Sequence, residues 1–152
     1  MYTLADLTQI TGAKRRSVQL WAEAGVLQAA PSTERSGSGV HRQFSRKEAI
    51  IACIVHTFAL KGVPIGRLLT ISKGVRHSLR AVKEAMPLIE LAIENKSNVF
   101  LAVDASTHDF LWFEKPTGED ALKVFEMMHT ANYAVDLILL NGSLKAMRFF
   151  QK

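Results

Sequence analysis

Three consecutive cations, Lys14, Arg15 and Arg16, stand at the start of a short segment with helical apolar spacing. Neighbouring like charges repel one another, and at the beginning of a helix they also oppose the positive end of the helix dipole. An anion outside the chain would compensate both costs, so the run indicates contact with a polyanion. A solvated basic turn is the alternative interpretation.

Residue types that could support catalysis or hold a metal are present but scattered. Cys53 is the only cysteine, which excludes an intrachain disulfide and a cysteine-based zinc site. No Ser-His-Asp or glycine-rich phosphate signature occurs. We therefore expect no catalysis, no metal and no cofactor. The remaining candidates follow no metal-ligand spacing and are interpreted as solvated or packed residues: Asp104, His108, Asp109, His129 and Asp136.

Charge divides the chain into two parts. The 152 residues carry a net charge of +5, and 48% of them are hydrophobic. Residues 1–82 hold 12 Lys and Arg against 4 Asp and Glu, a net +8, whereas residues 83–152 hold 7 against 10, a net −3. This asymmetry predicts a polyanion-binding module joined to a second domain that does not bind the polyanion. No apolar run is long enough to span a bilayer and no signal-peptide profile is present, so we expect a cytoplasmic protein without membrane association.

Two short helices with a tight turn between them would position the three cations. Thr3 and Asp6 form a near capping box for a first helix that ends at Gly12. A second helix is expected from about Lys14 to Ala24. Such a helix-turn-helix inserts the N-terminal end of its second helix into a major groove of DNA, and the cations lie at that end. The inward positions expected for the second helix are Val18, Leu20 and Trp21.

The following residues predict a winged arrangement. Residues 28–44 contain a proline and two glycines and read as a loop with extended arms, a wing. Residues 45–48 form a full capping box for a third helix that ends at about Leu60. Pro64 then opens a short fourth helix.

These elements resemble the MerR family of bacterial transcription regulators over about residues 2–72. The resemblance rests on LADLTQITGAKRRSVQLWAEAGVL for the helix-turn-helix, RQFSRKEAI where the wing meets the third helix, and LKGVPIGRLL for the fourth helix. It implies a sequence-specific regulator of transcription that binds double-stranded DNA in the nucleoid, with RNA polymerase as a partner. Excisionases and some phage repressors are similar in fold, so an architectural or recombination-directionality factor is one alternative. A protein-interaction adaptor, whose basic helix docks on an acidic partner, is another.

The resemblance also assigns roles to residues of the second helix. The start of this helix reads bases in the family, so Arg15, Arg16 and Ser17 are candidates for contact with base edges. Lys14 and Gln19 are candidates for phosphate contact. The family usually has a small hydroxyl residue and an arginine at these two positions, so the base preference stays open.

Trp21 stands where the family usually has tyrosine. We expect the indole to pack in the core, with a phosphate contact through its N–H as the alternative. In the wing, Arg35, His41 and Arg42 resemble residues that contact the DNA backbone in the family. A solvated loop is the alternative for Arg35.

A linking helix is predicted over residues 73–96, and Pro87 should kink this helix or begin a new one. Its apolar residues alternate at spacings of 4 and 3, which is a heptad seam. A helix at this place pairs with its twin in the family, so the resemblance implies a homodimer. An intrachain core helix is the alternative. The seam consists of Val75, Leu79, Val82, Met86, Ile89 and Ile93.

Residues 97–152 resemble no known family and predict a small β-β-α-β-β domain. NVFLAVD and DFLWFEK alternate like paired strands, TGED caps a helix, and Asn141-Gly142 between VDLILL and SLKAMRFF indicates a type I′ hairpin. The expected fold class is therefore α+β, with a winged helix-turn-helix in residues 1–72, the linking dimerisation helix and this domain. A small-molecule pocket, a protein-binding surface and an oligomerising surface stay open for it. The residues that would form its core or line such a pocket are Phe110, Trp112, Phe125, Met127 and Met128.

Overall fold

The computed structural model of the protein describes residues 1–33, 41–104, 109–114, 118–130 and 135–150, and the chain forms two units. The first comprises Met1–Lys73 and Ala146–Lys152, and the second comprises Gly74–Lys145. Helices and sheets are both present, as in the α+β class predicted from the sequence. The sequence places every residue after 97 in one domain, whereas the last residues belong to the first unit. There the Tyr2 hydroxyl donates a hydrogen bond of 2.7 Å to the carbonyl oxygen of Phe150.

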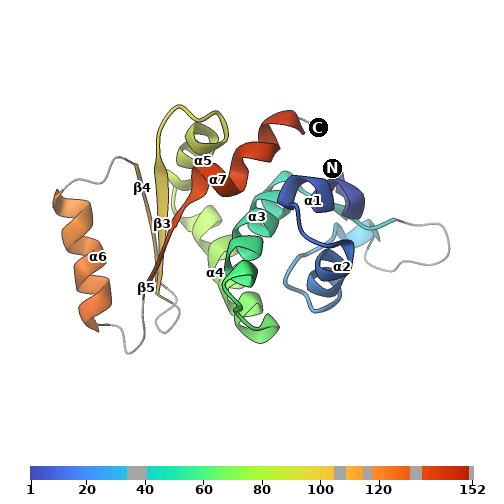
Figure 1. Ribbon diagram of the computed structural model, residues 1–152, viewed down its shortest axis with the longest axis horizontal. Coiled ribbons are helices and arrows are strands. Elements are labelled where there is room, and N and C mark those ends of the chain that lie inside the picture. Colours follow the sequence, from blue (N-terminus) through green and yellow to red (C-terminus); the bar gives the residue numbers. More distant parts are fainter. Residues whose placement is uncertain (34–40, 105–108, 115–117, 131–134, 151–152) are drawn as a thin grey trace. The chain divides into compact units, whose positions relative to one another are not determined.

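Two short helices follow strand β1 (Tyr2–Thr3) in the first unit (Figure 1). Helix α1 (Leu4–Thr11) begins at a complete capping box, in which the Thr3 amide donates to Asp6 at 2.8 Å and the Asp6 amide donates to Thr3 Oγ1 at 3.2 Å. Gly12 ends the helix at φ 74°, a conformation that glycine adopts without steric cost. Helix α2 (Arg15–Glu23) then begins after Lys14, which is the N-cap residue and forms no side-chain cap. Both predicted helices are confirmed within about one residue at each end.

The set of buried residues in α2 differs from the prediction at one position. Val18 and Trp21 are buried, as expected, but Leu20 is 50% exposed. Leu20 lies four residues after Arg16, so it falls in the same outward row of the helix rather than beside Trp21. The prediction of an inward Leu20 is wrong.

Extended segments distant in sequence meet at the start of α1. Strand β2 (Gln43–Phe44) pairs antiparallel with β1, with Tyr2 opposite Phe44. On its other side the Ala30 amide donates to the Gln43 carbonyl oxygen at 2.7 Å, next to a short 3-10 helix, η1 (Pro31–Thr33). The two described ends of the expected wing are therefore hydrogen-bonded to each other. Residues 34–40, with Arg35, lie outside the described part of the chain.

Helix α3 (Arg46–Leu60) supplies more buried residues than any other element of the first unit. The Glu48 amide donates to Ser45 Oγ at 3.2 Å, which is the predicted N-cap. The Glu48 side chain is only 6% exposed and accepts a hydrogen bond of 2.9 Å from the Gln28 amide. The Glu48 side chain, which the sequence assigned to a capping box, thus holds the segment that follows α2.

Helices α4 (Ile65–Ala81) and α5 (Ala85–Ile93) replace the short fourth helix and the linking helix expected from the sequence. Helix α4 ends at Ala81 and a new helix begins at Ala85, so of the two outcomes expected at Pro87 the structure shows a new helix rather than a kink. Pro87 lies in the first turn of α5, where a backbone N–H has no intrahelical partner and a proline is tolerated.

The predicted heptad seam is distributed over these two helices. Four of its residues are buried within the single chain, at no more than 4% exposure: Val75, Leu79, Ile89 and Ile93. Val82 and Met86 are half-buried. The burial of the four agrees with the alternative interpretation, in which this segment supplies core residues within one chain.

The second unit contains a three-stranded antiparallel sheet in the order β4-β3-β5. Strand β3 (Val99–Asp104) pairs with β4 (Asp109–Glu114) and with β5 (Val135–Leu139), and Leu101 lies opposite Trp112 and Ile138. Helix α6 (Gly118–Thr130) lies on one face of the sheet and α5 on the other (Figure 1). The two predicted strands and the helix after them are confirmed.

The predicted hairpin at Asn141-Gly142 is wrong. These residues lie in helix α7 (Leu140–Leu144), which continues into a 3-10 helix, η2 (Lys145–Phe149). The Asn141 side chain accepts a hydrogen bond from the Val99 amide at 3.0 Å and donates one to the Ser97 carbonyl oxygen at 2.8 Å. An amide that would favour a type I′ turn in isolation is thus engaged by the start of β3, and the domain reads β-β-α-β followed by helices.

Candidate nucleic-acid interface

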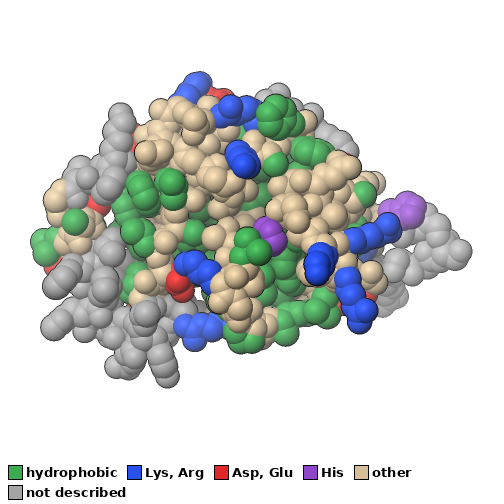
Figure 2. All heavy atoms as spheres, viewed as in Figure 1, with side chains coloured by type: hydrophobic (Ala, Val, Ile, Leu, Met, Phe, Trp, Pro, Cys, Tyr) green, Lys and Arg blue, Asp and Glu red, His purple; other side chains and the backbone are tan. Residues whose placement is uncertain are grey.

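Lysine and arginine side chains gather on the first unit around α2 (Figure 2). Lys14, Arg15 and Arg16 are all exposed, and α2 has no acidic residue in its first turn. Within the described ranges, none of the three forms an ion pair or a side-chain hydrogen bond. Three positive charges therefore lie beside the positive end of a helix dipole without compensation from the described chain.

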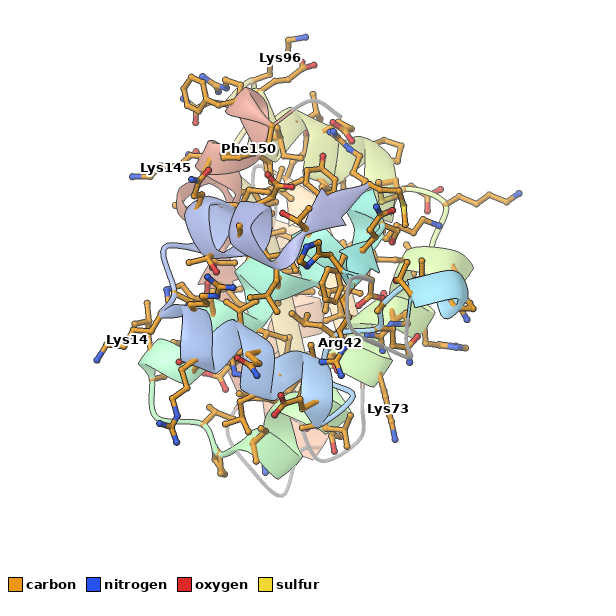
Figure 3. The ribbon with its side chains drawn as sticks, turned by 90° about the vertical axis from the view of Figure 1, so that its right-hand side faces the viewer. Lys14, Arg42, Lys73, Lys96, Lys145 and Phe150 are labelled. Carbon is orange, nitrogen blue, oxygen red and sulfur yellow. The ribbon has the colours of Figure 1, made fainter. Side chains whose placement is uncertain are left out.

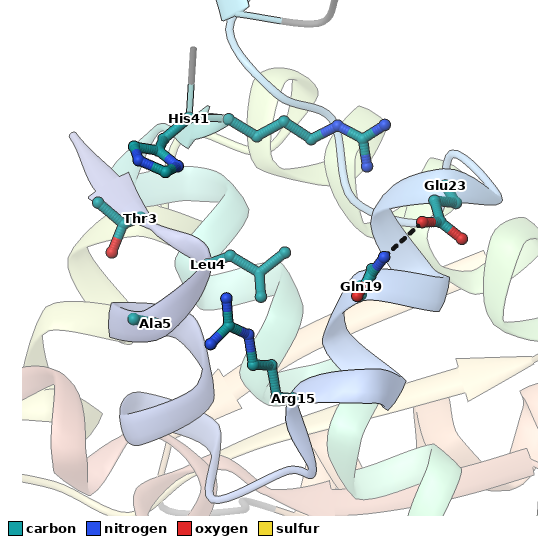
Figure 4. A pocket seen from close by; sticks show the side chains of 8 residues that line it. Thr3, Leu4, Ala5, Arg15, Gln19, Glu23 and His41 are labelled. Atoms are coloured by element: carbon teal, nitrogen blue, oxygen red, sulfur yellow. Dashed lines mark hydrogen bonds between the residues drawn. The ribbon is translucent and has the colours of Figure 1, made fainter. Parts of the chain in front are cut away.

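An open hollow of about 480 Å³ lies between α2, the start of α1 and the residues before β2. The pairing of β2 with β1 brings the residues before β2 next to the start of α1. In Figure 4 the Arg15 guanidinium points from the start of α2 toward Leu4, and the His41 ring lies on the opposite side near Thr3. The hollow is lined by Thr3, Leu4, Ala5, Arg15, Gln19, Glu23, His41 and Arg42.

Polar side chains of α2 form one wall of this hollow. Arg15, Gln19 and Glu23 follow one another at intervals of four residues and so share one row of the helix. The Gln19 side-chain amide donates a hydrogen bond of 2.9 Å to Glu23 Oε1. Among the described residues that line the hollow, Glu23 is the only carboxylate, against two arginines.

Arg42 comes from the far side of the hollow. It is half-buried and follows His41 in the segment that leads into β2. In Figure 3 Lys14 extends outward at the start of α2, and Arg42 lies toward the other end of that helix. The two arginines of the hollow therefore come from separate elements.

Trp21 lies behind α2 rather than on its outer surface. Its side chain is 4% exposed, and its ring centroid is 6.0 Å from that of His56. Burial lowers the pKa of His56 from its ordinary value of 6.5. The indole thus packs in the core, which is the first of the two interpretations made from the sequence.

The structure brings four of the predicted contact residues together in the hollow, namely Arg15, Gln19, His41 and Arg42. Lys14 and Arg16 are exposed beside it, and Ser17 is half-buried. Sequence reasoning missed Thr3, Leu4, Ala5 and Glu23 as lining residues. The spacing of four residues from Arg15 to Gln19 and Glu23 could have indicated Glu23. No sequence pattern indicates the other three, because they join the site through the pairing of β1 with β2.

The structure describes only some of the scattered catalytic and metal candidates. No group of three or more His, Cys, Asp and Glu that could hold a metal occurs in those ranges. Asp104 is fully buried at the end of β3, while His108 and the side chains of Asp109 and His129 lie outside the described part. Burial raises the pKa of the Cys53 thiol to about 12, which leaves it protonated at neutral pH.

The aromatic residues of the second unit form core contacts where they are described. Trp112 is 7% exposed, and its indole N–H donates to Ser78 Oγ in α4. Phe110 packs against α4 at Gly74. The other three predicted pocket or core residues have side chains outside the described part: Phe125, Met127 and Met128.

No protein-family model matches the chain, and no curated protein matches it either. Among the helices in the described ranges, none has the length and apolarity needed to cross a membrane.

Proposed function

We propose that the protein is a sequence-specific transcription regulator that binds double-stranded DNA through a MerR-like winged helix-turn-helix in its first unit. The observation that carries the proposal is the set of exposed, uncompensated cations at the start of α2. A helix of this kind enters a major groove by its N-terminal end, where arginine forms paired hydrogen bonds with guanine. The net +8 of residues 1–82 supports the same partner, because phosphate neutralisation dominates DNA affinity.

Arg16 has the best position on α2 to read a base. It lies in the outward row of the helix, outside the hollow, together with Leu20. Lys14 lies at the N-cap, before the first helical turn, and its long side chain suits a phosphate. The two cations therefore have different expected roles although they are two residues apart.

Selection of bound duplexes from random DNA, followed by competition binding, tests this assignment. Arg16→Ala should reduce discrimination between the selected duplex and a scrambled one by about tenfold or more, since a good arginine–guanine pair contributes about 1–3 kcal/mol. Lys14→Ala should weaken binding to both duplexes equally.

Equal losses on both duplexes for Arg16→Ala would contradict the assignment, and salt-independent binding would favour the adaptor class. A footprint that spreads over adjacent sites and bends the DNA would favour the architectural class.

The regulator is further proposed to act as a homodimer, because one small winged module contacts too few base pairs to be selective. The half-buried seam residues, Val82 and Met86, are the ones that remain accessible for a partner chain. Val82→Asp with Met86→Asp should convert a dimer into a folded monomer in light scattering, because a desolvated carboxylate opposes association. A dimer that survives both changes would require an interface elsewhere. RNA polymerase and an effector of the second unit belong to the same proposal as later partners.

A further inference from the structure

Arg15 lines the hollow beside α2 and Arg16 does not, although the sequence makes both of them candidates for base contact. Arg15 belongs to the helix row that lines the hollow, with Gln19 and Glu23, whereas Arg16 belongs to the adjacent row. Figure 4 shows the Arg15 guanidinium directed toward Leu4 at the start of α1. A side chain directed there points across the hollow instead of along the axis by which α2 would enter a groove.

The wall opposite α2 also carries positive charge. Arg42 lines the hollow beside His41, and neither forms an ion pair within the described ranges. The N-terminus of α1 contributes less, because the capping box already engages the amides of Thr3 and Asp6. Side chains, rather than a helix terminus, therefore supply the positive charge of this hollow.

We propose that one strand of the DNA backbone lies in this hollow, with Arg15 and Arg42 each binding a phosphodiester oxygen from opposite walls. This inference rests on the proposed function and changes the role of Arg15 from base reading to positioning. A planar guanidinium matches phosphate oxygens in a bidentate geometry, and phosphate contacts set the register of a protein on its duplex. The hollow is open to solvent, as a site for one stretch of a long polymer must be.

Replacement of Glu23 is a second test of the same geometry, because it should change DNA affinity in the opposite direction. Its carboxylate lines the hollow and would repel a phosphate there. Glu23→Gln removes the charge, and the new amide oxygen can still accept from Gln19. This variant should bind all duplexes more tightly, whereas Arg15→Gln should bind all of them about tenfold more weakly.

The central experiment combines Arg15→Gln with a scan of the selected duplex by single neutral methylphosphonates. Arg15→Gln should lower the slope of log affinity against log salt by about 0.9 per protomer. One methylphosphonate position should remove the difference between Arg15→Gln and the unchanged protein. A second position should do the same for Arg42→Gln. The two should lie on one strand within about four nucleotides, since the 9 residues of α2 span about 13.5 Å at 1.5 Å per residue. Arg16→Gln is the matched control, and no neutral phosphate should remove its effect.

The results separate this inference from the proposed function. If Arg15→Gln loses discrimination between duplexes as Arg16→Gln does, Arg15 reads bases and the inference is wrong while DNA binding stands. It is also wrong if no methylphosphonate position removes the effect of Arg15→Gln. Inorganic phosphate serves as the second probe, and NMR of the full chain monitors its binding. Saturable binding of this ion at the hollow, together with no binding of any duplex, would overturn both proposals.

Discussion

Replacing Gly74 by alanine tests how closely α4 packs on β4 in the second unit. A Cβ atom at Gly74 would lie well inside the van der Waals distance of the Phe110 ring, at Cε2 and Cζ. A Cβ atom at Gly66, in the same helix, would have no heavy atom within 4 Å. The two glycines are therefore a matched pair, of which one faces a neighbour and the other faces open space.

The two substitutions should change the free energy of unfolding in opposite directions. Alanine is about 1 kcal/mol more favourable than glycine in a helix interior, and less so in the first turn, where Gly66 lies. At Gly66 this gain is unopposed, so the variant should be more stable by up to about 1 kcal/mol. At Gly74 the overlap with Phe110 costs about 1–3 kcal/mol, as overpacking does elsewhere. The net effect of Gly74→Ala is therefore a loss of about 1 kcal/mol.

Urea unfolding followed by circular dichroism measures both effects. With an m value of about 2 kcal/mol/M, the midpoint should fall by about 0.5 M for Gly74→Ala and rise for Gly66→Ala. The loss should shrink when Phe110 is also replaced by leucine, which is shorter than the ring it replaces. A Gly74→Ala variant as stable as Gly66→Ala would refute the reasoning, and so would a loss that is unchanged in the Phe110→Leu background.

Three further predictions concern buried groups. Ser78→Ala should lower the free energy of unfolding by about 1–3 kcal/mol, because it leaves the buried indole N–H of Trp112 without its acceptor. Ser72→Ala is its control and should cost less, since the Ser72 hydroxyl only donates to the Leu69 carbonyl oxygen of its own helix. The folded pKa of His56 lies below 6.5, so the unfolded chain binds more protons between the two values and stability is lost as the pH falls below about 6.5. Unfolding curves across that range should show a smaller loss for His56→Gln. Cys53 should resist iodoacetamide at about pH 8 in the folded protein and react in denaturant, and rapid labelling of the folded protein would contradict its burial.

Much of the local structure follows from short-range signals in the sequence. The capping box of Thr3 and Asp6, the left-handed Gly12 and the N-cap at Ser45 all lie where the sequence predicts them. Each depends on hydrogen bonds or dihedral angles within about four residues, so distant neighbours do little to change them. The exposed cations at the start of α2 were predictable for a similar reason, since a run of charges cannot be buried without partners.

Long-range contacts decided the remainder. The hairpin signal at Asn141 fails because its side chain bonds to Val99 and Ser97, more than forty residues earlier in the chain. The heptad spacing predicted an apolar face but did not indicate whether a partner chain or the same chain would cover it. Residues such as Leu79 are buried within the same chain. The spacing of apolar residues specifies that a face is buried, but only the packed structure specifies by what.

In the candidate site, too, the sequence determined one part and the tertiary structure the other. The sequence alone determined that Lys14, Arg15 and Arg16 form a cluster of positive charge on a short helix. It could not separate Arg15 from Arg16, because the hollow that distinguishes them is closed on one side by Arg42 and the start of α1. Pairing of β1 with β2 joins these segments across about forty residues of sequence. Both strands have only 2 residues, too few for the alternation of apolar and polar side chains that marks a strand in a sequence, so this wall of the site is visible only in the tertiary structure.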